Sequence, residues 1–127
     1  MESISSEKLP LIRHTLDKLS LAIDILQERT ASIQTVDDFL ATPGGMEKLD
    51  AACMVLIAIG ETVKNLDKIT EKKLLPTYPA IPWKNVMGIR DIIAHHYFEV
   101  DADVVFEIVN KQLASLKEAV TFFQKEL

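Results

Sequence analysis

The sequence has little cysteine, little histidine and no long apolar run, and each shortage excludes a class of protein. The 127 residues include one cysteine, Cys53, so no disulfide can form within the chain. Cys53 has apolar neighbours on both sides, and burial there raises a thiol pKa and makes it a poor nucleophile. Every apolar run is too short to cross a membrane. The first eight residues lack the basic start and apolar stretch of a signal peptide, so we expect a cytoplasmic protein without membrane attachment.

Positive charge is also scarce. The chain has 14 lysines and arginines against 19 acidic residues, which gives a net charge of −5. A surface of this sign does not attract nucleic acid as a whole. Any binding of RNA would therefore depend on a local basic or hydrogen-bonding site.

Length and composition favour a single folded domain over residues 1–127. Hydrophobic residues make up 48% of the chain and charged residues 26%, which is the balance of a folded soluble protein. A domain of this length can bury about two-thirds of its unfolded surface.

The apolar residues repeat with helical spacing in the first half of the chain. Residues 7–32 carry an apolar stripe with alternating gaps of four and three residues, which predicts an amphipathic helix. Thr35 and Asp38 have the spacing of a capping box and predict a short helical turn. Pro43-Gly44-Gly45 is expected to break the chain before a second long helix over residues 46–69. We expect this helix to be buried on most sides. Glu61 is expected to point to solvent, and the alternative is that it approaches the functional cleft.

The second half predicts two more helices. Three prolines between residues 76 and 82 exclude a helix there, and Pro82 suits the start of one over Trp83–His95, with Trp83 as a core anchor. Asp101 is a candidate cap for the last helix. That helix carries a further stripe, Val105, Val109, Leu113, Leu116, Val120, Phe123 and Leu127. The predicted fold is all-α, an antiparallel bundle of four to five helices with room for a second copy of the chain.

The segment from Arg90 to Tyr97 holds the residues best suited to chemistry. Two of the three histidines, His95 and His96, are adjacent, and the third, His14, is expected on the surface. Arginine matches a phosphate with its fixed cationic fork, and histidine exchanges protons near neutral pH. RNA carries its own nucleophile, the 2′-hydroxyl, so these groups could cleave it without a metal or a cofactor. Adjacent histidines face different directions and lack a third ligand, which disfavours a metal site.

The spacing poses a geometrical problem. On a regular helix, residues five apart differ by about 140° around the axis, so Arg90 and His95 would not share a face. Either the helix loosens near His95, or two copies bring their Arg90 and His95 side chains together across a two-fold axis. A purely structural helix end is the third interpretation, since Ile92 and Ile93 resemble core residues.

At these residues the sequence resembles the HepT-like branch of the HEPN superfamily. Its motif is an arginine, four residues, a histidine, one residue and a tyrosine, and the sequence matches it with Arg90, His95 and Tyr97. The residue after the arginine is usually polar in the superfamily, as Asp91 is. Three flanking segments are also similar, namely Ile59–Thr62, Tyr78–Trp83 and His96–Asp101.

The resemblance implies a specific function. Such proteins are helical bundles that form homodimers, and many are metal-independent endoribonucleases. HepT-like members are toxins of type VII toxin–antitoxin pairs, whose antitoxin is a minimal nucleotidyltransferase that transfers AMP to the motif tyrosine. By this analogy Arg90 and His95 are catalytic, Asp91 is supporting, and Tyr97 is the AMP acceptor. His96 occupies a variable position and receives no role.

A different function uses the same residues without cleavage. The chain would then be a non-catalytic subunit that binds a nucleotide or a nucleotidyltransferase partner through the same segment. The acidic balance of the sequence is compatible with this alternative.

Overall fold

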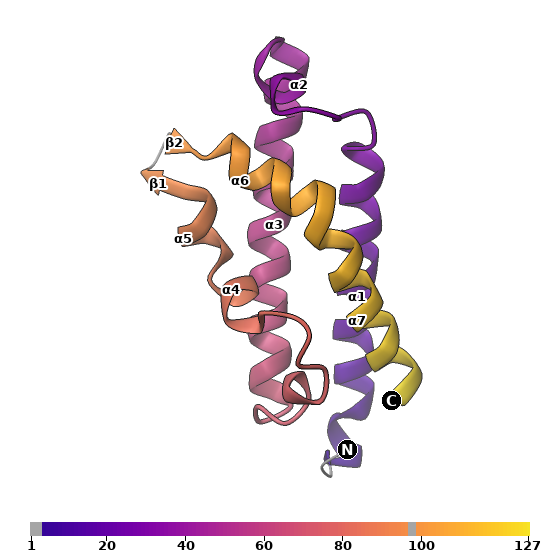
Figure 1. Ribbon diagram of the computed structural model, residues 1–127. Coiled ribbons are helices and arrows are strands. Elements are labelled where there is room, and N and C mark those ends of the chain that lie inside the picture. Colours follow the sequence, from indigo (N-terminus) through magenta and orange to yellow (C-terminus); the bar gives the residue numbers. More distant parts are fainter. Residues whose placement is uncertain (1–3, 97–98) are drawn as a thin grey trace.

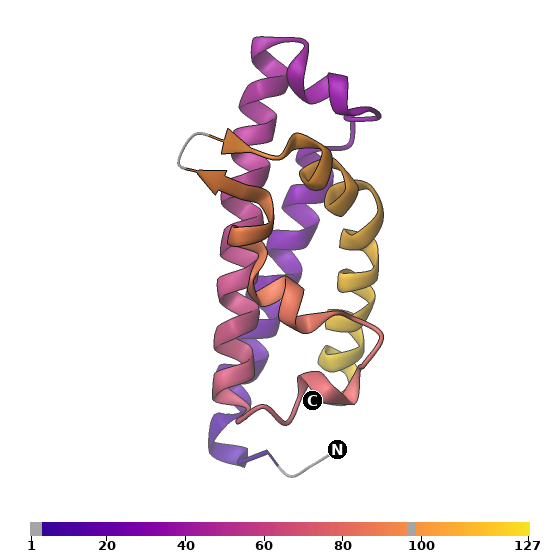
Figure 2. The same cartoon turned by 60° about the vertical axis from the view of Figure 1, so that its left-hand side comes forward.

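The computed structural model describes residues 4–96 and 99–127, without the side chains of residues 95, 96 and 99. Three long helical segments run side by side along the molecule: α1 (Leu9–Arg29), α3 (Pro43–Ile69) and the run from α6 (Ala102–Glu107) through η3 (Ile108–Gln112) to α7 (Leu113–Glu126). The short helices α4 (Trp83–Met87) and α5 (Ile89–Ile93) lie along α3 and return the chain upward (Figures 1 and 2). The directions alternate up, down, up and down, which confirms the predicted all-α antiparallel bundle.

The first helix agrees with its predicted stripe. A single 3-10 turn, η1 (Ser6–Lys8), precedes α1, and Pro10 occupies the first turn of α1, where no N–H is needed. The five predicted stripe residues are all buried, with at most 1% exposure: Ile12, Leu16, Leu19, Ile23 and Leu26. The stripe faces α3 and α7, the two helices against which α1 packs most.

The capping box before α2 (Val36–Leu40) forms as predicted. The Thr35 side chain accepts from the backbone N–H of Asp38, and a carboxylate oxygen of Asp38 accepts from the backbone N–H of Thr35 at 3.0 Å. A second bond, from the N–H of Gln34 at 2.7 Å, reaches the same carboxylate. Hydrogen bonds from these two backbone N–H groups stabilise the charged form and lower the pKa of Asp38.

The long helix α3 differs from the prediction in two respects. It begins at Pro43, three residues early, because the Thr42 hydroxyl caps it by accepting from Gly45 N–H at 2.9 Å. The expectation that α3 is buried on most sides holds where it packs against α1, α2, α4, α5 and α6. The exception is an outer strip, on which Met54 is 71% exposed and Met46 is 52% exposed.

The last helix contains a π-helical segment that the sequence pattern did not predict. Ile108 is buried and Val109 only half-buried, although the predicted stripe used Val109. The next buried residue is Leu113, five positions after Ile108, and η3 spans this gap. A π turn closes at the fifth residue rather than the fourth, so it keeps both side chains on the core side. Asp101 caps α6 as predicted by accepting from Val104 N–H at 3.1 Å.

Candidate ribonuclease site on α5 and β1

Two anchors fix the position of Arg90. The neighbouring Ile89 and Ile93 are buried at 6% and 0% exposure, so α5 has a fixed rotation on the core. Gly60 of α3 allows this close packing. A Cβ atom at position 60 would lie 2.7 Å from the Ile89 Cγ2 atom and 2.8 Å from the Val86 carbonyl oxygen. The backbone of α3 thus touches α4 and α5 directly below the Arg90 segment.

The rotation of α5 places Arg90 on the side away from α6. Ile92 lines a groove between α5 and α6, and residues two apart on a helix lie about 160° from each other around the axis. Arg90 is exposed, and no hydrogen bond or ion pair involves its guanidinium within the described part of the chain. A guanidinium in this situation is available for a phosphate group.

The helix that carries Arg90 ends before His95, which corrects the predicted range of Trp83–His95. Gly88 divides the range into α4 and α5, and α5 ends at Ile93. Ala94 then has extended backbone angles, φ −132° and ψ 118°. The strand β1 (Ala94–His96) pairs in antiparallel fashion with β2 (Glu99–Val100), where a joint without strands was expected. The N–H of Asp101 donates to the Ile93 carbonyl at 2.8 Å and replaces the next helical bond.

The backbone departs from a regular helix before His95. The backbone of His95 lies in an extended strand, so the 140° separation of a regular helix does not apply. The first alternative, a helix that loosens near His95, is therefore observed. The side chain of His95 and the whole of Tyr97 lie outside the described residues, so their predicted roles stay predictions.

Asp91 is exposed beside Arg90. Its backbone N–H donates to the Gly88 carbonyl at 3.1 Å. Its carboxylate has no hydrogen-bond or salt-bridge partner among the described residues. The carboxylate therefore does not orient Arg90 in this structure, and its supporting role stays a prediction.

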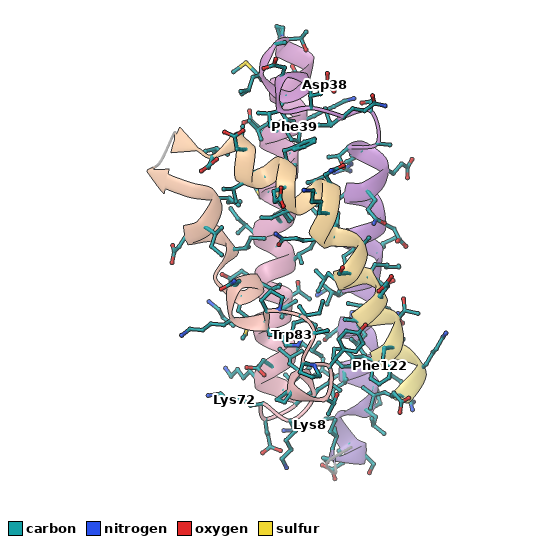
Figure 3. The ribbon with its side chains drawn as sticks, viewed as in Figure 1. Lys8, Asp38, Phe39, Lys72, Trp83 and Phe122 are labelled. Atoms are coloured by element: carbon teal, nitrogen blue, oxygen red, sulfur yellow. The ribbon has the colours of Figure 1, made fainter. Side chains whose placement is uncertain are left out.

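The aromatic residues before α4 hold the segment on the core. The ring of Trp83 stacks on Phe123 of α7 with centroids 5.8 Å apart, and its indole N–H donates to the Tyr78 carbonyl at 2.9 Å. The Tyr78 ring contacts Phe122 at 5.3 Å (Figure 3 labels Trp83 and Phe122). The predicted anchor role of Trp83 is confirmed.

The other candidate residues lie outside this site. Glu61 is exposed and forms a loose ion pair with Lys64 at 3.8 Å, as expected for a residue facing solvent. His14 is exposed on α1.

Burial raises the pKa of the Cys53 thiol to about 11, with a smaller contribution from the charge of Asp50. Excluding the side chains of residues 95–99, no cluster of three potential metal ligands is present.

The two sides of α5 have different characters. On one side, a groove of about 570 Å³ lies between α4–α5 and α6–α7, with Leu56 and Ile59 among its apolar residues. On the other side, α3 exposes a strip that is apolar except for one carboxylate, and its residues are Met46, Asp50, Met54 and Ala58. Sequence reasoning missed this strip. The signal was the apolar run over residues 51–60, which is apolar on every side of the helix, whereas the bundle leaves Met54 and Ala58 of this run exposed.

Comparison with known proteins agrees with the motif. The family model described as "Ribonuclease HepT-like" matches residues 19–122. The chain belongs to the HepT-like ribonuclease family. At the level of the family, this makes it an enzyme that acts on RNA, and the match includes all of α3 to β2 together with most of the last helix.

Individual relatives support the family. A protein named "Putative RNase" from Caldanaerobacter subterraneus is 32% identical over 118 residues, which cover 92% of this chain and 95% of the relative. A "Probable ribonuclease HepT" from Thermococcus cleftensis is 31% identical over 102 residues, 80% of this chain and 86% of the relative.

A longer relative contains the same region. The "Gamma-glutamylcyclotransferase and putative RNase" of Methanocaldococcus jannaschii is 33% identical over 112 residues, and the match spans 88% of this chain but about half (47%) of that protein. No solved structure matches the chain. In the described residues, no helix is both long and apolar enough to span a membrane.

Proposed function

We propose that this HepT-like protein is a metal-independent endoribonuclease toxin whose site combines Arg90 and His95 in a homodimer. The observation that supports this most directly is the exposed Arg90 on α5. Its guanidinium has no partner in the described part of the chain, and it lies four residues before the start of the extended strand that carries His95. Arg90 contacts the scissile phosphate and stabilises the charge that builds up on it. His95 exchanges a proton with the reacting oxygens.

The reaction follows from the chemistry of RNA. The 2′-hydroxyl loses its proton to a base and attacks the adjacent phosphorus, and the bond to the 5′-oxygen breaks as that oxygen gains a proton. The products are a 2′,3′-cyclic phosphate and a 5′-hydroxyl end. No step requires a metal ion, and a substrate without the 2′-hydroxyl at the cleavage point should resist the enzyme.

The second copy is supported by the exposed face of α3. Met54 is 71% exposed and Met46 is 52% exposed there, and a partner that covered them would remove this apolar surface from water. Arg90 lies on the side of α5 away from the groove, and the exposed face of α3 does not line the groove either. A two-fold axis through that face would bring two copies of the Arg90 segment to one shared cleft.

The first experiment tests catalysis. Purified protein is incubated with end-labelled RNA in EDTA, and the fragments are analysed for cyclic phosphate ends. Wild type should cleave, and Arg90→Ala and His95→Ala should each lose at least about a hundredfold in rate. His14→Ala is the matched control, because His14 is an exposed histidine of α1 and should keep full activity. Cleavage that persists in both site variants would refute the proposed site.

We also propose that a cognate nucleotidyltransferase antitoxin inactivates the enzyme by transferring AMP to Tyr97. The Tyr97 oxygen attacks the α-phosphate of ATP, and pyrophosphate leaves. A negatively charged nucleotide next to His95 repels RNA phosphate and occupies its place. Co-expression with the partner should add the mass of AMP to wild type and not to Tyr97→Phe, whereas Tyr78→Phe should still be modified. Equal modification of wild type and Tyr97→Phe would contradict the acceptor assignment.

A further inference from the structure

The sign of the charge changes along the molecule. The whole chain carries −5, yet residues 64–84 contain five lysines and only two acidic residues. These residues form the end of α3, the following loop and the beginning of α4. The beginning of α4 lies below α5, and the loop before it is at the lower end of the molecule (Figure 1). The local excess of positive charge is therefore on the lower side of the Arg90 segment.

Helix geometry places three cations away from the groove. Ile59 lines the groove, and Lys68, nine residues later, lies about 180° away around α3. Val86 also lines the groove, and Lys84, two residues earlier, lies about 160° away around α4. Arg90 lies about 160° from Ile92 on α5 by the same argument. All three therefore lie away from the groove.

The same residues are close along the helix axis. Gly60 is the contact point of α3 with Ile89, the neighbour of Arg90. At about 1.5 Å per residue, Lys64 and Lys68 follow Gly60 by about 6 and 12 Å. Lys84 is in α4, whose Val86 carbonyl also contacts Gly60. Lys72 lies near the lower end of α3 (Figure 3).

These lysines are free to bind an anion. Lys68 and Lys84 are exposed, and neither side chain has a hydrogen-bond or ion-pair partner in residues 4–96 and 99–127. Lys64 pairs with Glu61, but both side chains are more than half exposed and 3.8 Å apart. Such exposed pairs contribute little and exchange readily for another anion.

We propose that Lys64, Lys68 and Lys84 form a lysine surface that binds the RNA backbone next to the phosphate held by Arg90. The inference rests on the proposed ribonuclease function and names the part of the protein that holds substrate beyond the reacting bond. It explains how an acidic protein binds a polyanion, because the positive charge is concentrated beside one site. Contacts to phosphates carry no sequence information, so this surface raises affinity without selecting bases.

The test compares two double variants with the same charge. Lys68→Glu/Lys84→Glu alters the lysine surface, and Lys111→Glu/Lys125→Glu is the control on the last helix. Each lowers the net charge from −5 to −9. Lys68 and Lys125 each lie in the last turn of a long helix, where a negative charge interacts unfavourably with the helix dipole. The loss of stability from this effect should therefore be similar in the two double variants. Circular dichroism and thermal unfolding verify that both variants fold.

The direct measurement is binding of a fluorescent single-stranded RNA made uncleavable by 2′-O-methyl groups. Lys68→Glu/Lys84→Glu should weaken RNA binding by about tenfold or more. It should also make the fall of log K with the logarithm of salt concentration less steep by about 1.4, which corresponds to the loss of two phosphate contacts. The control should remain within about twofold of wild type. On cleavable RNA, the test variant should lose kcat/KM mainly through KM.

The outcomes separate this inference from the proposed function. Wild-type cleavage with equal binding by both double variants would overturn the lysine surface and leave the function intact. Selective loss of binding in Lys68→Glu/Lys84→Glu would support the surface even if the wild type did not cleave. An absence of RNA binding by the wild type would overturn the surface, and the EDTA cleavage assay would then judge the function alone.

Discussion

Individual residues whose roles depend on near neighbours were predictable from the sequence. The Thr35–Asp38 capping box and the Asp101 cap form as expected, because both partners lie within four residues of each other. Arg90 was identified by its chemistry and by the resemblance. The sequence did not predict that its guanidinium has no partner among the described residues, since this depends on every chain segment that could approach it. The environment of Cys53 was predicted from its apolar neighbours and is confirmed by its burial.

Cys53 gives a prediction on pH dependence. Its pKa is raised from the ordinary value near 9 to about 11 in the folded protein, so the folded state binds the thiol proton more tightly than the unfolded state does. The stabilisation that this provides is complete below about pH 9 and is lost as the pH rises toward 11. Urea denaturation at pH 8 and pH 10.5 should show a larger fall in the free energy of unfolding for wild type than for Cys53→Ala. Parallel falls would contradict the assignment.

At the level of elements, helix existence was predictable and helix ends were less so. The prediction placed a single helix over Trp83–His95, but Gly88 divides it and the backbone turns extended at Ala94. Pairing of β1 with β2 decides this end, and such pairing is a tertiary effect that local propensity does not encode. The π segment η3 was missed for a related reason. A regular helix with buried residues at alternating spacings of four and three accounts for Val109, whereas the structure buries Ile108 instead and reaches Leu113 through a π turn.

The contact of α3 with α5 gives a prediction about two glycines. Gly60→Ala would place a Cβ atom 2.7 Å from Ile89 and 2.8 Å from the Val86 backbone, so α5 must move. We expect a loss of about 1–3 kcal/mol in stability and a lower cleavage rate, since Arg90 moves with α5. Gly44→Ala is the control, because its Cβ would meet nothing within 4 Å in the first turn of α3. Its stability should be unchanged or higher. Equal thermal stability of the two variants would refute the close contact.

The bundle as a whole was predictable because three long amphipathic stretches joined by short breaks have few ways to bury their apolar faces. The exposed face of α3 was not, since the sequence alone does not say which side of an apolar helix lacks a neighbour. That face is also where the proposed homodimer is most directly testable. A charge placed there should be tolerated by a monomer and not by a dimer.

Met54→Lys is therefore expected to separate the copies. The side chain is 71% exposed in the single chain, so the substitution should hardly affect folding, but a lysine buried between two copies would lack a partner. Light scattering after size exclusion should show a monomer for Met54→Lys and a dimer for wild type. Leu21→Lys on α1, which is 60% exposed, is the control and should remain dimeric. If the monomeric variant also loses cleavage while the Leu21 variant keeps it, the active site requires both copies. A monomer that cleaves at the wild-type rate would show instead that one chain supplies Arg90 and His95 to a complete site.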